Sequence, residues 1–199
     1  MKRGTLYVVS GPSGCGKGTI LAEIRKNPEV YISVSATTRE KRTGETEGVS
    51  YYYLSRSEFE ERIASDGMLE YAEYCGNYYG TMRQPVEEAL AAGKDVILEI
   101  EVVGAQKIRE KCPEAVFVFI APPSITELER RLHKRGTEEE AVVQSRVAQA
   151  SREIACAEAY DYVVVNGELS DAIAAVEAIL QAEKWKRNKV ERIEEVLGK

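Results

Sequence analysis

The sequence is poor in the residues that build disulfides and metal centres. Among its 199 residues are only four cysteines, at positions 15, 75, 112 and 156, which lie far apart and share no metal-ligand spacing. We expect them to be reduced thiols, which is typical of a cytoplasmic protein rather than a secreted one. The only histidine, His133, is expected to be a bystander on a helix face.

Long apolar runs and an excess of basic residues are also missing. The longest apolar runs are far below the roughly 18 residues that suggest a bilayer crossing, and no signal peptide is expected, so we predict no membrane partner. The 27 basic and 33 acidic residues give a net charge of −6. An acidic chain is a poor general binder of nucleic acid, so no nucleic-acid partner is predicted and any polyanion must bind locally.

What is present is a glycine-rich loop in a specific setting. Residues 11–18 read Gly-Pro-Ser-Gly-Cys-Gly-Lys-Gly, directly after an apolar run that is typical of a strand and before a helix-forming stretch. Backbone N–H groups in such a loop can converge on a phosphate, and Lys17 would reach the outer phosphates of a nucleoside triphosphate. An ordinary surface loop is the alternative, but the flanking strand and helix favour phosphate binding. The expected ATP-binding residues in this stretch are Gly11, Pro12, Ser13, Gly14, Cys15, Gly16, Lys17, Gly18 and Thr19.

One position in the loop departs from the usual pattern. The residue after the lysine is normally Ser or Thr, which binds magnesium, but here it is Gly18, and Thr19 comes one step later. Direct and water-mediated binding of Mg²⁺ by Thr19 both fit this order.

Strands and helices alternate along most of the chain. Such alternation with short apolar strands predicts an α/β fold with a parallel sheet, and the nearly all-apolar strand 115–121 is expected near its centre. A polar, aromatic block at 33–82 interrupts the alternation and is predicted to be an inserted lobe for substrate. The expected strands are 5–10, 95–101, 115–121 and 161–165, and the expected helices are 18–26, 57–65, 84–92, 103–112, 124–136, 138–158 and 171–198. Capping boxes are expected to begin the second helix at Ser57 and the fifth at Ser124.

The 33–82 block carries a second set of candidate binding residues. Arg39 and Arg42 lie three apart among hydroxyl residues, and guanidinium groups suit a phosphate monoester. Glu70 could accept hydrogen bonds from the ring N–H and the exocyclic amine of guanine, with Ser35 and Thr81 serving its carbonyl. A solvated basic face and packed tyrosines are the alternative interpretation of these residues.

Taken together, these motifs resemble those of guanylate kinases over roughly residues 4–182. The shared stretches are Gly-Pro-Ser-Gly-x-Gly-Lys from Gly11, Ser33-Val-Ser-x-Thr-Thr-Arg39-x-x-Arg42, Gly76-Asn-Tyr-Tyr-Gly80, Phe119-Ile-Ala-Pro-Pro-Ser124, Leu132-x-x-Arg135-Gly-Thr-Glu138 and Val165-Asn166. The resemblance implies a phosphate-loop nucleoside-monophosphate-kinase fold with a core (1–32, 83–124 and 151–199), a GMP-binding lobe (33–82) and a helical lid (125–150). The implied reaction moves the γ-phosphoryl group of ATP to GMP, and to dGMP, with Mg²⁺ bound to ATP.

The resemblance also implies individual roles. Those for GMP fall on Arg39, Arg42, Tyr51 and Tyr79 at its phosphate, and on Ser35, Glu70, Thr81 and Glu101 at its base. Those for ATP fall on Lys17, on the lid arginines Arg131, Arg135 and Arg146, and on Asn166 near adenine. Thr19 and Glu99 are the implied metal residues. The chain departs from the pattern at Val103, where relatives often have glutamine.

Two other functions fit parts of the sequence. One is a guanylate-kinase-like interaction module without catalysis, although such modules typically have degraded phosphate loops and here Lys17 is intact. The other is a kinase for a different nucleoside monophosphate, because a Gly-Thr pair after the lysine also occurs in adenylate kinases. The charged segment 184–192 fits either a solvated helix end or a self-association surface around Trp185, so a homo-oligomer is left open.

Overall fold

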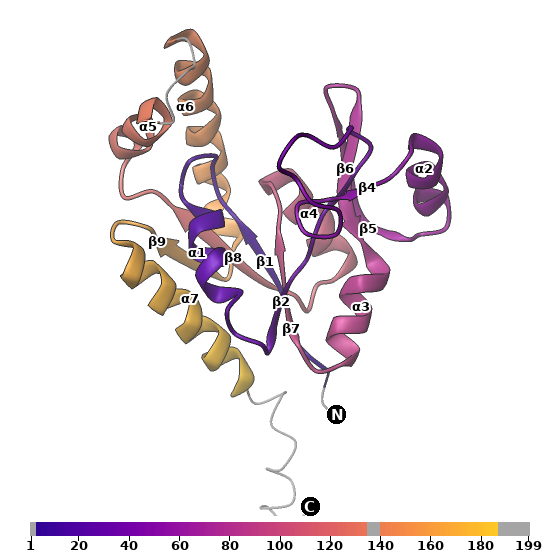
Figure 1. Ribbon diagram of the computed structural model, residues 1–199. Helices are drawn as coiled ribbons and strands as arrows, with labels where there is room; N and C mark the ends of the chain where they lie inside the picture. The colour runs from indigo at the N-terminus through magenta and orange to yellow at the C-terminus, as the bar shows by residue number, and fades with distance from the viewer. Residues whose placement is uncertain (1–2, 135–139, 187–199) are drawn as a thin grey trace, which may run out of the picture.

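A five-stranded parallel sheet forms the centre of the structure (Figure 1). The computed structural model describes residues 3–134 and 140–186. The strand order in this sheet is β2-β7-β1-β8-β9. Its strands are β1 (Leu6–Ser10), β2 (Val30–Ile32), β7 (Asp95–Glu99), β8 (Val116–Ala121) and β9 (Tyr162–Val165). The predicted α/β class with a parallel sheet is confirmed, although the middle strand is β1 and the strand predicted to be central, β8, lies beside it.

Helices cover both faces of this sheet because the side chains of β1 alternate between two apolar cores. Tyr7 and Val9 pack toward α1 (Lys17–Ile24) and α7 (Leu169–Lys184), whereas Leu6 and Val8 pack toward α3 (Arg83–Ala91) and α4 (Val102–Lys111). Successive side chains of a strand point to opposite faces of its sheet, so a strand that is covered on both faces contributes alternate residues to two cores. This three-layer core holds fixed the strand end from which the phosphate loop departs.

A second sheet occupies part of the 33–82 block. Its four strands have the order β4-β3-β6-β5, and the long pair β5–β6 is antiparallel. The strands are β3 (Ala36–Thr37), β4 (Tyr52–Tyr53), β5 (Met68–Tyr74) and β6 (Asn77–Met82), and α2 (Arg56–Ala64) lies between β4 and β5 in the chain. Phe59 of α2 is fully buried in a small core of this sheet and stacks on Tyr78 with ring centroids 5.2 Å apart.

Two expected boundaries, the start of α2 and the end of β7, were wrong. The capping box of α2 begins at Ser55, not Ser57: the Glu58 N–H donates to the Ser55 hydroxyl, and the Glu58 carboxylate accepts from the Ser55 N–H. Both serines have a glutamate three residues later, so the spacing alone could not choose between them. The predicted strand 95–101 ends at Glu99, and Glu101 instead precedes the first turn of α4.

A pair of helices rises above the sheet. These are α5 (Ile125–Lys134) and α6 (Glu140–Ala155), which continues into the short 3₁₀ helix η1 (Cys156–Ala159). Leu128 and Leu132 of α5 pack against Val143 and Val147 of α6. The expected cap of α5 is confirmed, since the Glu127 N–H donates to the Ser124 hydroxyl. The parts of the predicted helices at 135–139 and 187–198 lie outside the described residues.

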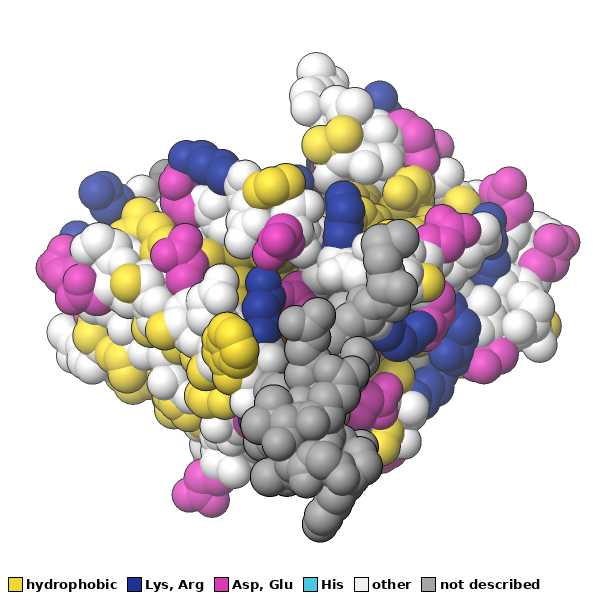
Figure 2. Space-filling model, turned by 90° about the horizontal axis from the view of Figure 1, so that it is seen from below, with side chains coloured by type: hydrophobic (Ala, Val, Ile, Leu, Met, Phe, Trp, Pro, Cys, Tyr) yellow, Lys and Arg dark blue, Asp and Glu magenta, His cyan; other side chains and the backbone are white. Residues whose placement is uncertain are grey.

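Charge is mixed on the face opposite the helix pair. Figure 2 looks at the molecule from below, and on the described part of this face lysine and arginine side chains alternate with acidic ones. Along residues 3–134 and 140–186, no helix is both long enough and apolar enough to cross a membrane.

Candidate functional site

The glycine-rich loop joins β1 to α1 in a conformation that only glycines tolerate. Gly11, Gly14 and Gly16 all have positive φ angles, of 147°, 90° and 96°. A Cβ atom at Gly16 would also lie 2.3 Å from the side-chain nitrogen of Asn166. The loop therefore turns sharply and presents backbone N–H groups at the N-terminus of α1, which begins at Lys17.

The ammonium group of Lys17 lies over this loop. Its Nζ donates to the carbonyl oxygens of Gly11 at 2.5 Å and Pro12 at 3.1 Å. Cys15 beneath it is completely buried, and burial raises the pKa of its thiol, so Cys15 fills space rather than offering a thiolate. The structure thus brings the predicted lysine to the mouth of the loop.

Two oxygen-bearing side chains lie near the start of α1. Thr19 is exposed in its first turn, and Glu99 ends the neighbouring strand β7. A Cβ atom at Gly18 would lie 3.9 Å from the Glu99 carboxylate oxygen, so this carboxylate faces the helix start. A hydroxyl and a carboxylate are the donor types that Mg²⁺ prefers in proteins, and the pair fits a magnesium bound beside phosphates.

Asn166 connects three parts of the site. Its buried side-chain amide donates to the carbonyl of Cys15 at 2.7 Å, and its backbone N–H donates to Ala121 at the end of β8. Its own carbonyl accepts from Arg131 of α5 at 3.0 Å. Asn166, which the resemblance predicts to lie near adenine, is a brace between the phosphate loop and the helix pair in this structure.

Substitutions at Asn166 test its role as a brace. Asn166→Ala leaves the Cys15 carbonyl without its buried donor, so we expect a loss of about 1–3 kcal/mol in the free energy of unfolding. Asn166→Asp keeps the size but sets an acceptor against that carbonyl, so it should cost at least as much. Urea unfolding measures both effects, and an aspartate variant as stable as the parent protein would contradict the bracing role.

Arg131 and Arg146 of the helix pair make contacts at or beside the phosphate loop. Arg131 donates to Glu127 at 2.7 Å as well as to Asn166, and Arg146 donates to the hydroxyl of Ser13 at 2.6 Å. Arg146 thus contacts the phosphate loop directly, whereas Arg131 contacts Asn166 and Gly167, in the segment that braces the loop. The third predicted lid arginine, Arg135, lies outside the described residues.

A buried carboxylate forms the candidate base pocket on the second sheet. Glu70 on β5 is 7 % exposed and accepts a 2.9 Å hydrogen bond from the Thr81 hydroxyl on β6. Burial raises the pKa of Glu70, while the Thr81 hydrogen bond and the charge of Lys107 oppose that shift and Glu101 adds to it. Ser35 is half-buried on the chain segment that leads into β3, and its carbonyl accepts from the Tyr52 N–H.

Beside the same sheet, Arg39 binds a carboxylate of the protein itself, that of Glu45. Both terminal nitrogens of the Arg39 guanidinium donate to the Glu45 carboxylate, at 2.7 and 3.1 Å. The hydroxyl of Tyr53 and the backbone N–H of Arg42 donate to the same carboxylate, at 2.7 and 2.8 Å. These donors, Arg39 first, lower the pKa of Glu45 to about 2, so the group stays ionised near neutral pH.

Two predicted tyrosines surround this anion site. The Arg39 guanidinium lies 5.4 Å from the ring centre of Tyr51, and the Tyr79 side chain is next to the same guanidinium. The rings of Tyr51 and Tyr79 meet edge to face with centroids 6.2 Å apart. Arg39, Tyr51 and Tyr79 therefore converge as predicted, and the structure adds Glu45 and Tyr53, which the sequence analysis missed.

Comparison with known proteins agrees with this arrangement. The guanylate kinase family profile matches residues 3–183. A protein from Carboxydothermus hydrogenoformans named guanylate kinase is 55 % identical over 96 % of this chain and 94 % of its own length, and one from Desulfitobacterium hafniense is 53 % identical over 91 % of each. The chain belongs to the guanylate kinase family. The crystal structure of guanylate kinase from Anaplasma phagocytophilum has a TM-score of 0.76 and 34 % identity, and covers 98 % of this chain and 94 % of its own.

Membership of the guanylate kinase family settles the enzyme class. Such identity over nearly the whole chain supports catalysis and does not favour the interaction-module alternative.

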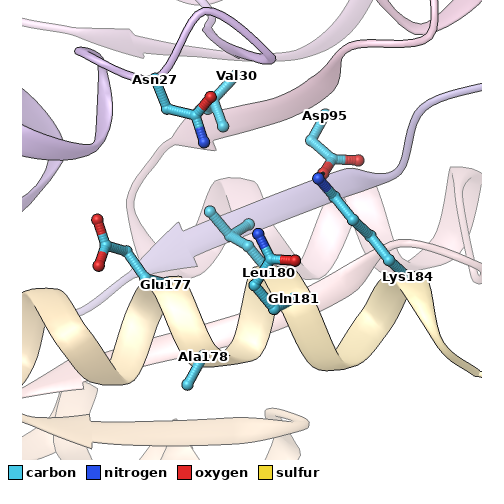
Figure 3. Close-up of a pocket in the computed structure, with 8 residues that line it drawn as sticks. All are labelled: Asn27, Val30, Asp95, Glu177, Ala178, Leu180, Gln181 and Lys184. Carbon is cyan, nitrogen blue, oxygen red and sulfur yellow. The ribbon is translucent and has the colours of Figure 1, made fainter.

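One cavity of the described structure lies away from these groups. Its volume is about 250 Å³, and it opens beside α7 where β7 begins (Figure 3). Because the strands are parallel, Asp95 at the start of β7 lies at the sheet edge opposite the phosphate loop. Lys184, which lines the cavity, pairs with Glu29 at 2.9 Å. The lining residues are Asn27, Val30, Asp95, Glu177, Ala178, Leu180, Gln181 and Lys184.

Proposed function

We propose that this protein transfers the γ-phosphoryl group of ATP to GMP, and to dGMP, giving ADP and GDP. One observation carries the choice of acceptor: the buried Glu70–Thr81 pair and the anion site of Arg39 lie on one sheet. Tyr79 beside Arg39 and Thr81 beside Glu70 are two residues apart on β6, so their side chains point to the same face. A base pocket and a phosphate site on one face suit a nucleoside monophosphate.

The base pocket favours guanine because of its hydrogen-bonding pattern. Glu70 can accept from both the ring N–H and the exocyclic amine, which guanine offers side by side and adenine does not. Ser35 and Thr81 would serve the carbonyl of guanine, and Glu101 would lie at the edge of the base. A Cβ atom at Gly104 would lie 3.2 Å from the Glu70 carboxylate, so the glycine lets α4 approach the pocket closely.

The phosphate of GMP would replace the carboxylate of Glu45. In support, Arg39 already donates two parallel hydrogen bonds to that carboxylate, a geometry that also suits a phosphate group. The side chains of Arg42, Tyr51 and Tyr79 would donate further hydrogen bonds to the phosphate, in addition to those from Arg39. On this proposal Glu45 keeps Arg39 positioned until GMP arrives.

ATP would bind at the opposite side, on the glycine-rich loop. Lys17 would leave the Gly11 and Pro12 carbonyls for the phosphates, and Arg131, Arg146 and Arg135 would approach from the helix pair. The Asn166 segment would lie beside adenine. Thr19 and Glu99 would hold Mg²⁺, which when bound neutralises phosphate charge and orients the leaving group.

The residues act by positioning and by neutralising charge. Phosphoryl transfer asks little covalent chemistry of the protein, and the acceptor oxygen of GMP is already anionic near neutral pH. Arg39 would hold that oxygen in line while Lys17 and the lid arginines stabilise charge on the moving group. His133, 45 % exposed on α5, takes no part in this reaction.

On the same proposal, each part of the chain would have a separate role in binding the substrates. The core (1–32, 83–124 and 151–199) would hold ATP, the lobe (33–82) GMP, and the lid (125–150) would close over the phosphates and exclude water. A cytoplasmic location and the lack of a nucleic-acid partner stay predictions.

The test is ADP release with different acceptors. Purified protein with ATP and Mg²⁺ should release ADP rapidly with GMP or dGMP. With AMP, UMP, CMP or no acceptor, the rate should be lower by about 10⁴-fold, because a wrong base leaves the polar groups of the pocket unpaired. Equal rates with AMP and GMP would contradict the assignment of Glu70 to guanine, and no release with any acceptor would overturn the proposed activity.

A further inference from the structure

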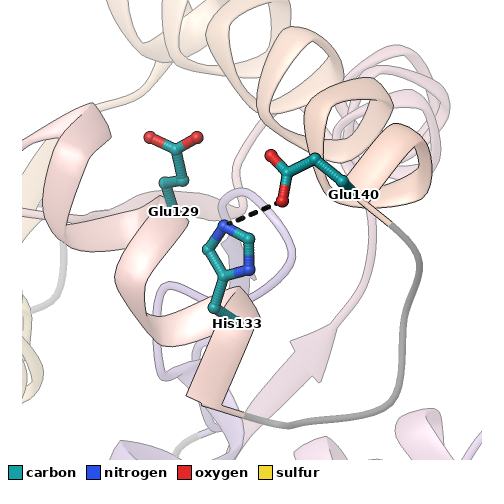
Figure 4. Close-up of side chains that lie close together, drawn as sticks. All are labelled: Glu129, His133 and Glu140. Atoms are coloured by element: carbon teal, nitrogen blue, oxygen red, sulfur yellow. Dashed lines mark ion pairs between the residues drawn. The ribbon is translucent and has the colours of Figure 1, made fainter.

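The helix pair carries a cluster of metal-ligand side chains that the proposed reaction does not use. Glu129 and His133 are one turn apart on α5, and the side chain of Glu140 at the start of α6 points toward them (Figure 4). One ligand atom from each residue lies within 4.8 Å of the other two. The imidazole Nε2 of His133 and the Glu140 carboxylate are 3.7 Å apart.

These distances are close to those of a zinc centre. With bonds of about 2.0–2.1 Å, neighbouring ligands of a tetrahedral Zn²⁺ are about 3.3 Å apart. The His133–Glu140 distance exceeds this by a few tenths of an ångström. The Glu129 oxygen lies within 4.8 Å of the other two ligand atoms, so it would have to move closer by at most about 1.5 Å, which a side-chain rotation can supply. One imidazole and two carboxylates suit Zn²⁺ or Co²⁺ rather than Mg²⁺, which prefers oxygen ligands alone.

A fourth side chain holds the two carboxylates in place. The amide nitrogen of Gln144 on α6 donates to Glu129 at 2.7 Å and to Glu140 at 2.9 Å. Two like charges on facing helices are thereby kept close together although they repel each other. Metal-binding carboxylates commonly have such hydrogen-bonded support.

We propose that Glu129, His133 and Glu140 form a binding site for a divalent transition-metal ion of the zinc class, with water as the fourth ligand. The bound ion links α5 to α6 through side chains of both helices. Because Arg131 lies between Glu129 and His133 in the sequence, the ion also restrains the helix that carries a lid arginine. This site is separate from the magnesium that accompanies ATP.

Binding can be measured without the kinase reaction. Metal-free, nucleotide-free protein is titrated with Zn²⁺ by calorimetry and with Co²⁺ by absorption spectroscopy. We expect one site per chain, a cobalt spectrum without the intense near-ultraviolet band of thiolate ligands, and slower amide hydrogen exchange in α5 and α6 with Zn²⁺ bound. His133→Gln should weaken Zn²⁺ binding by more than about tenfold.

A matched control comes from the same helix. Glu153 is half-buried on α6 and accepts from Gln149 at 3.0 Å, as Glu140 does from Gln144, but it is not in the cluster. Glu153→Gln should therefore bind Zn²⁺ as the parent protein does. Unchanged affinity in His133→Gln, equal losses in both variants, or a thiolate-dominated cobalt spectrum would each overturn the metal site and leave the phosphotransferase proposal intact.

Discussion

Lys17→Ala should lower kcat/KM for ATP by about 10³-fold or more and leave the fold intact. Removing one preorganised donor from a charge-stabilising site costs about 10²–10³-fold, and Lys17 carries a full charge as well. We expect the fold not to depend on that charge, because Nζ is half-buried and contacts two loop carbonyls and, at 3.9 Å, the Cys15 sulfur, with no carboxylate partner among the described residues. Steady-state kinetics with GMP saturating, together with thermal unfolding, measure both quantities.

Lys26→Ala is the matched control for this experiment. Lys26 follows the same helix, and its ammonium pairs with Glu23 in a highly exposed position. Its removal subtracts the same formal charge without touching the loop, so kcat/KM should stay within about twofold, since exposed pairs are worth little. If Lys17→Ala kept most of its activity, the phosphate loop would not be the site of charge stabilisation.

The sequence predicted the phosphate loop best because its chemistry is local. Three glycines with positive φ angles and the lysine after them lie within residues 11–17, and their setting between a strand and a helix can be recognised from apolar patterning. Glu70 and Thr81 could be proposed only as candidates, because the hydrogen bond between them depends on the register of β5 and β6.

The contacts that sequence reasoning missed are those between distant segments. The role of Asn166 as a brace joins residues 151 positions apart, and no spacing rule indicates it. Glu45 is only six residues from Arg39, but a glutamate in a charged loop is usually solvated. In the cluster around His133, the pair Glu129 and His133 can be seen in the sequence, because the two residues are four apart on a helix. The third member, Glu140, reaches them only through the packing of α6 on α5.

Glu70→Gln should lower kcat/KM for GMP by about 10²-fold or more while KM for ATP changes little. The amide places a donor where the carboxylate accepted, so one guanine N–H faces another donor in a buried pocket. The Thr81 hydroxyl can still donate to the remaining oxygen. Initial rates at varied GMP and at varied ATP separate the two effects.

The stability of the Glu70→Gln variant distinguishes a binding role from a structural one. Burial raises the pKa of Glu70, which means that the folded protein disfavours this charge before GMP binds. A neutral amide of the same size should therefore leave the melting temperature unchanged or raised while activity falls. Glu73→Gln, on the exposed end of the same strand, should change neither quantity. A Glu70→Gln protein that melted earlier and lost activity equally toward ATP and GMP would show that Glu70 supports the sheet rather than the base.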